Sequence, residues 1–114
     1  MKIILSNVIP FKGYSAINIF SIIFVRKDYY NRVSINKMKE VLNHEQIHTK
    51  QMQELLYVFF YIWYGLEYLI KLCYYFNFHK AYKNVSFERE AYEYENDYKY
   101  LENRKHYSWF KYVI

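Results

Sequence analysis

The sequence has few of the residues that interrupt regular structure or cross-link it. Its 114 residues include two Gly, one Pro and one Cys. So few Gly and Pro argue against a disordered chain, a turn-rich β-sandwich and long linkers. The single Cys73 excludes an internal disulfide, and its apolar neighbours predict a small buried residue of a protein from a reducing compartment. The length predicts a single domain over residues 1–114.

Long runs of one charge are also missing. Sixteen Lys and Arg against eleven Asp and Glu give a net charge of +5, but the basic residues are spread along the chain. No RNP box, paired Cys/His finger or helix-turn-helix glycine turn accompanies them. We therefore expect a solvated basic surface and no nucleic-acid partner.

The first third of the chain differs from the rest. Residues 1–30 are predicted to form a short β-ribbon, because residues 2–8 and 16–25 are rich in β-branched and aromatic side chains. The break between these two strands, residues 9–13, contains the only Pro. The apolar run after Met1 is too short for a signal peptide, which favours a cytoplasmic protein.

The segment HEQIH, in which His44 and His48 flank Glu45, has the H-E-x-x-H pattern of zinc hydrolases. It lies in residues 36–64, which contain neither Pro nor Gly and are predicted to form one helix capped by Asn36. Helical residues four apart share a face, so both imidazoles can bind one metal ion. Glu45 is placed to act as the general base on a water that the metal activates.

The motif interrupts an apolar stripe on this helix, and Glu45 and His48 fill the gap in it. The apolar members of the stripe are Met38, Val41, Met52, Leu55 and Phe59. Burying two imidazoles and a carboxylate costs several kcal/mol unless they are paired or bound to metal, which favours a metal site. The alternative is that both His residues bond to neighbours and Glu45 pairs with a nearby Lys.

A catalytic zinc site usually has a third protein ligand, and the acidic segment 84–104 is the expected source. We predict that this segment is a helix. The two segments together resemble the gluzincin metallopeptidases, in which H-E-x-x-H is completed by a Glu from a later helix. Residues 87–91 (FEREA) resemble the F-E-x-x-A stretch that supplies this ligand in the membrane-embedded gluzincins that process prenylated proteins. Those enzymes continue with Asp, whereas this chain has Tyr92.

Two residues compete for the third ligand. Helix periodicity places Glu90 closer to the centre of the apolar face, whereas the resemblance implies Glu88. Ala91 leaves room for the two helices to approach. We therefore predict Glu88 as the ligand, with Glu90 as a supporting partner or substitute ligand. Without the upstream motif, a solvated acidic helix face would be the simpler interpretation.

Residues 66–79 are predicted to form an apolar helix between the two motif segments. The apolar run that precedes Glu67 has twelve residues, fewer than the roughly twenty of a transmembrane helix. Glu67 and Lys71 could pair at i, i+4, and the nearby Trp and Tyr are typical of a membrane interface. Membrane contact and a buried helix or hairpin that bends near Gly65 both remain open.

These observations predict a mainly α (α+β) fold, with a zincin-like core of about three helices behind the β-ribbon. The predicted function is hydrolysis of peptide bonds in a peptide or protein substrate, with Zn²⁺ held by His44, His48 and Glu88 and Glu45 as the base. The alternative is a non-catalytic metal-binding or membrane-surface protein that retains the motif. The sequence does not specify the oligomeric state.

Overall fold

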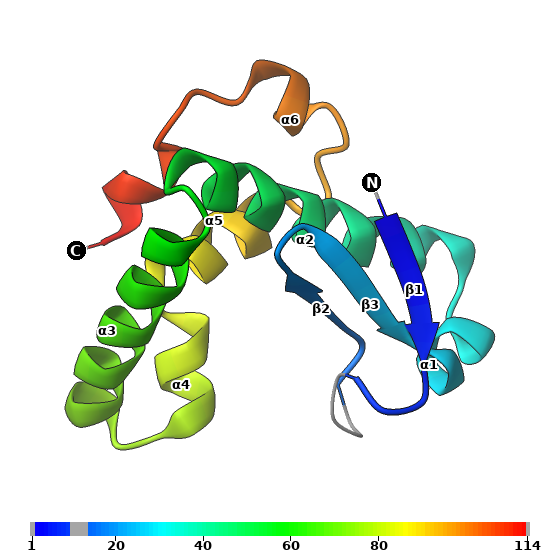
Figure 1. The fold of residues 1–114 in the computed structure, drawn as a ribbon, viewed down its shortest axis with the longest axis horizontal. Helices are drawn as coiled ribbons and strands as arrows, with labels where there is room; N and C mark the ends of the chain where they lie inside the picture. The colour runs from blue at the N-terminus through cyan, green and yellow to red at the C-terminus, as the bar shows by residue number, and fades with distance from the viewer. Residues whose placement is uncertain (1, 10–13, 114) are drawn as a thin grey trace.

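The computed structural model describes residues 2–9 and 14–113, and its fold is mainly α with a small sheet, which confirms the predicted class (Figure 1). Of the predicted break at residues 9–13, residues 10–13 lie outside the described residues. In chain order, the elements are β1 (Lys2–Ser6), β2 (Ala16–Ile19), β3 (Ile22–Arg26), α1 (Lys27–Arg32), α2 (Ile35–Glu54), α3 (Val58–Tyr75), α4 (Phe78–Lys83), α5 (Ser86–Tyr94), α6 (Tyr100–Asn103) and the 3-10 helix η1 (Ser108–Tyr112).

The sheet has the order β1-β3-β2, with β1 parallel and β2 antiparallel to β3. The prediction of one strand over residues 16–25 was wrong, because the chain turns back at Phe20 and Ser21. Both residues have positive φ, 49° and 70°, as two-residue hairpin turns of this hand require. The Phe20 N–H donates to the Tyr61 hydroxyl (2.9 Å), and the Ser21 hydroxyl donates to Tyr57 (3.0 Å). Contacts distant in sequence therefore hold a turn that lacks Gly.

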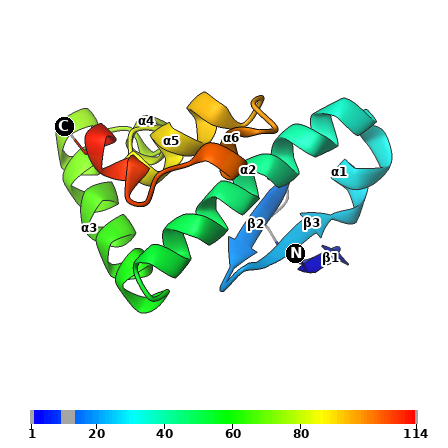
Figure 2. The same ribbon diagram turned by 90° about the horizontal axis from the view of Figure 1, so that it is seen from above.

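Helix α2 lies between the sheet and α5 (Figure 2). Ile23 and Val25 of β3 are fully buried. The Asn18 side-chain amide of β2 donates to the Glu45 carbonyl oxygen and to the Thr49 hydroxyl, each at 2.7 Å. This pair of bonds fixes β2 against the middle of α2.

The predicted helix over residues 36–64 was wrong at both ends. Ser34, not Asn36, is the N-cap, and its side chain accepts from the Lys37 N–H at 3.2 Å. At the other end α2 stops at Glu54, and the chain bends by 111° into α3. The Tyr57 N–H donates to the Met52 carbonyl at 2.8 Å, as in a Schellman motif. The bend therefore precedes Gly65, which lies inside α3.

Four further expectations differ from the structure. Residues 27–32 form α1, although residues up to 30 were assigned to the β-ribbon. The predicted apolar helix over residues 66–79 belongs to α3 and α4, and the predicted helix over residues 84–104 is divided into α5 and α6. Cys73, expected to be buried, is exposed.

The main apolar cluster joins α2, α3 and α5 to the end of the chain. Its buried members are Met52, Phe60, Val85, Phe87 and Trp109. The Trp109 ring of η1 packs on Phe87 and Trp63, with ring centroids 4.7 and 5.4 Å apart. The C-terminal segment thus closes the core around the first turn of α5.

The bend between α2 and α3 can be tested through Leu56, which has a φ of 54° and is 72% exposed. We expect Leu56→Gly to raise the free energy of unfolding by about 0.5–1 kcal/mol, because Gly adopts this conformation without steric cost. Urea unfolding measures the change. The matched control, Leu66→Gly in the interior of α3, should lower it by about 1 kcal/mol. A less stable Leu56→Gly variant would contradict the proposed strain.

Candidate metal centre

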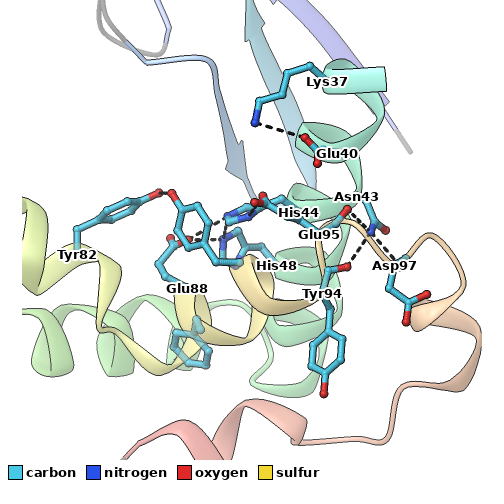
Figure 3. Close-up of polar contacts among 12 residues, drawn as sticks. Lys37, Glu40, Asn43, His44, His48, Tyr82, Glu88, Tyr94, Glu95 and Asp97 are labelled. Carbon is cyan, nitrogen blue, oxygen red and sulfur yellow. Dashed lines mark hydrogen bonds and ion pairs between the residues drawn. The ribbon is translucent and has the colours of Figure 1, made fainter. Parts of the chain in front are cut away.

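Three side chains from α2 and α5 point toward one another inside the protein (Figure 3). The Glu88 Oε1 atom lies 3.0 Å from His44 Nε2 and 3.1 Å from His48 Nε2. The two Nε2 atoms are 3.2 Å apart. All three residues are buried, with 5–6% of their surface exposed. His44, His48 and Glu88 therefore form a buried group that could hold a metal ion.

The geometry and the donor types of this group fit zinc. Zinc lies about 2.0–2.1 Å from imidazole nitrogen and carboxylate oxygen, so two ligands of a tetrahedral ion are about 3.3 Å apart. The three observed separations, 3.0–3.2 Å, are close to that value. Two His and one Glu also form a known set of protein ligands for catalytic zinc, which leaves a fourth position for water or substrate.

The far nitrogen of each imidazole is held by an oxygen atom. His48 Nδ1 lies 2.7 Å from the side-chain oxygen of Gln51, and His44 Nδ1 lies 3.1 Å from a carboxylate oxygen of Glu95. Because both oxygens accept, a ring that is neutral carries its proton on Nδ1, and its Nε2 atom is then free to bind a metal ion. Such contacts orient metal-binding His residues in proteins.

Glu88 is held at both of its oxygens. Oε1 meets the two imidazoles, and Oε2 accepts a hydrogen bond from the Tyr64 hydroxyl of α3 at 2.8 Å. Burial raises the pKa of Tyr64, so its hydroxyl keeps its proton and remains a donor. The third member of the group is therefore positioned by α3 as well as by its own helix.

Charges within the group are strongly coupled. Burial opposes charging of the His44 ring, but the hydrogen bonds that the charged ring donates to the Glu88 and Glu95 carboxylates outweigh it and raise the pKa of His44 to about 10. Burial likewise opposes ionisation of Glu88, but the two imidazoles hold the pKa of its carboxyl well below the ordinary value. A carboxylate surrounded in this way requires a cation, either a proton on the imidazoles or a metal ion.

Glu90 supports the group without joining it. One Glu90 oxygen accepts from the Gln51 amide at 3.0 Å, so Glu90 orients the side chain that holds His48. Glu90 also forms an ion pair with Arg104, which binds Glu54 at 2.8 Å. Of the two candidates, the structure thus brings Glu88 to the His pair and Glu90 to the network behind it.

Glu45, the predicted base, is 8% exposed and lines two cavities beside the metal group. One cavity, of about 320 Å³, is shared with His48, Glu88 and residues of β2. The other, of about 420 Å³, is shared with His44 and Glu95. Tyr82 lines both cavities. Burial raises the pKa of Glu45 above its ordinary value.

Several supporting residues were missed by the sequence reasoning. Gln51 follows His48 by three residues on the same helix face, a spacing that could have indicated it. Glu95 follows Glu88 by seven residues, which again places both on one face. Tyr64 gave no comparable signal, because its contact with Glu88 depends on how α3 packs.

Asn43 was also missed. Its side-chain amide contacts the carbonyl oxygens of Tyr94, Glu95 and Asp97 at 2.9–3.2 Å (Figure 3). These bonds fix the end of α5 to α2, directly beside His44. They explain why the Glu95 carboxylate reaches the His44 ring.

Comparison of the chain with protein-family models, curated proteins and solved structures finds no match. The resemblance to gluzincins therefore rests on the motif residues alone.

The role of Gln51 yields a prediction about metal affinity. Gln51→Met removes the oxygen that accepts from His48, so we expect affinity for Zn²⁺ to fall 10–100-fold. Competition with a chromophoric chelator measures the affinity. Gln53→Met on the exposed face of the same helix is the matched control and should bind as the parent does. Equal affinity for both variants would show that Gln51 does not orient the ligand.

Proposed function

We propose that this chain is a zinc-dependent hydrolase of peptide bonds. The observation that carries the proposal is the convergence of His44 Nε2, His48 Nε2 and Glu88 Oε1 within 3.2 Å, with both Nδ1 atoms held by acceptors. Zinc held by these residues would lower the pKa of a water molecule toward neutrality and polarise a carbonyl group. The resemblance to gluzincins supports the same reaction.

Glu45 is proposed as the general base. It follows His44 directly on α2, and its side chain lines both cavities that adjoin the ligands. A carboxyl with a raised pKa accepts a proton from water more readily near neutral pH than an exposed one does. In this proposal, Glu45 takes the proton of the attacking water and then donates it to the leaving amine.

The substrate side of the proposal rests on β2. Within the described sheet β2 pairs with β3 alone, so its other edge is open beside the cavity that Ala16, Ile17 and Asn18 line. An extended peptide can add to such an edge through main-chain hydrogen bonds. Among the described residues, the buried Asn18 Oδ1 atom has no hydrogen-bond partner. An N–H of a bound peptide would satisfy it.

The Tyr82 hydroxyl is proposed to stabilise the oxygen of the substrate carbonyl group during the reaction. Its side chain lines both cavities with Glu45, and its hydroxyl lies 3.1 Å from that of Tyr92. Burial raises the pKa of Tyr82, so the group remains a neutral donor. Donors placed where negative charge develops are a major source of catalysis in acyl transfer.

Metal content tests the first half of the proposal. We expect the protein purified without added zinc to contain about one zinc per chain. His44→Ala/His48→Ala and, separately, Glu88→Gln should lose it, because the first removes both nitrogen ligands and the second replaces the anionic ligand by a neutral amide. Elemental analysis gives the ratio, and Glu102→Gln, on the exposed surface of α6, is the control. A parent protein without stoichiometric metal after exposure to zinc would refute the zinc site.

Glu45→Gln tests catalysis separately from metal binding. We expect this variant to retain zinc but to cleave unstructured peptides about 10²–10⁴-fold more slowly, because the amide cannot accept the proton. Mass spectrometry of a peptide mixture measures cleavage. Unchanged cleavage would exclude Glu45 as the base. A zinc-loaded parent that cleaves no peptide would favour the non-catalytic metal-binding alternative.

A further inference from the structure

The outward half of α3 consists of uncharged, mostly apolar residues. Ten of its eighteen residues are exposed, and at about 100° per residue they occupy one half of the helix circumference. We call these residues the α3 face: Val58, Phe59, Ile62, Trp63, Gly65, Leu66, Leu69, Ile70, Cys73 and Tyr74. In both ribbon views α3 forms one edge of the molecule (Figures 1 and 2). An exposed apolar surface of this extent marks an interaction site.

The polar residues of α3 lie on the opposite side, toward the protein. Glu67 is 7% exposed and accepts from the Trp63 indole at 2.7 Å and from the Ser86 N–H at 3.0 Å. Lys71 is half-buried. This distribution is the reverse of that in a surface helix of a water-soluble domain, where charged residues face solvent.

The charged side chains of the segment that contains the α3 face are positive, apart from one buried carboxylate. Residues 55–86 contain Lys71, Lys80 and Lys83 but a single acidic residue, the buried Glu67. Lys80 and Lys83 are exposed on α4, which packs against α3. The segment that contains the α3 face therefore has a net positive charge, which complements an anionic surface.

We propose that the α3 face seats the protein on a lipid bilayer with anionic headgroups. Eighteen helical residues extend about 27 Å, and a helix that lies along the interface buries such a face at the boundary between headgroups and acyl chains. Trp63 and Tyr74 suit that depth. No single helix in the described part of the chain is long and apolar enough to cross a membrane, although the bent pair α2 and α3 meets the criterion together.

A second copy of the chain explains these features less well. In a twofold dimer that covers the α3 face, this positively charged segment would approach the same segment of the partner. The segment offers no exposed carboxylate to pair with its lysines, and like charges at an interface are unfavourable. Anionic headgroups supply the missing negative charge.

The proposal is independent of hydrolysis, because the α3 face and the metal group lie on different sides of α3. Phe60, Tyr61 and Tyr64, on the inward side, line the cavity beside His48. Binding to lipid would therefore leave these side chains facing the metal group.

Flotation with lipid vesicles tests the proposal on the full chain. We expect the protein to partition onto vesicles of phosphatidylglycerol and phosphatidylcholine and to bind phosphatidylcholine alone more weakly. Leu66→Glu/Ile70→Glu should weaken partition at least about a hundredfold, because two exposed apolar side chains that the bilayer would bury are replaced by anions. Ile35→Glu, at an apolar residue of α2 that is more exposed than Leu66 and Ile70, should not change it. Circular dichroism checks that each variant is folded.

The single cysteine provides a second measurement that needs no substitution. Cys73 is exposed on the α3 face, so an environment-sensitive fluorophore can be attached there. Its emission should rise when anionic vesicles are added. If the emission does not change and the protein does not float with the vesicles, the proposal is overturned. If the protein binds phosphatidylcholine vesicles as strongly as anionic ones, the proposed preference for anionic headgroups is overturned. A dimer in vesicle-free buffer that shields the fluorophore would assign the face to a second copy instead.

Discussion

Two imidazole nitrogens and a carboxylate oxygen lie within 3.2 Å of one another in the interior of the protein. At such short distances their lone pairs repel one another unless a positive charge lies between them. Much of the described structure around α2 keeps these atoms together. Asn43 fixes the end of α5 beside His44, and Arg104 links Glu90 of α5 to Glu54 of α2. Those contacts hold α5 against α2 along its length, so the ligand atoms cannot relax apart. The group is therefore already assembled in the structure, which would lower the cost of binding a metal ion.

The sequence predicted the fold class but missed two sharp turns of the chain. Both turns, at Phe20–Ser21 and Leu56–Tyr57, have residues other than Gly at positive φ. Local propensity gives no signal for such turns, because L side chains rarely adopt that conformation. Here the two turns stabilise each other, since the Phe20 N–H donates a hydrogen bond to the Tyr61 hydroxyl and the Ser21 hydroxyl donates one to the Tyr57 hydroxyl. Both turns depend on contacts between residues about forty positions apart in the sequence. A pattern read within a short stretch of sequence therefore cannot predict them.

Helical spacing accounts for the part of the candidate site that was predicted. The i, i+4 rule brings His44 and His48 together, and Glu88 was preferred to Glu90 because of a resemblance, against the apolar periodicity. Glu90 does lie at the centre of the buried face, with no exposed surface, but Arg104 and Gln51 satisfy it there. The gluzincins that the motif resembles have Asp at the position of Tyr92. In this chain Glu95, about one helical turn later, supplies a carboxylate that contacts His44. The Tyr92 ring packs edge-on against the same imidazole, with centroids 4.5 Å apart.

The buried carboxylate of Glu67 ties α3 to the beginning of α5. It accepts from the backbone N–H of Ser86, two residues before Glu88, and Tyr64 of the same helix holds the Glu88 carboxylate. A tilt of α3 therefore pulls on the Glu88 side chain at two points, the start of its helix and its own Oε2 atom. Through this linkage the packing of α3 determines where the Glu88 carboxylate lies relative to the two imidazoles.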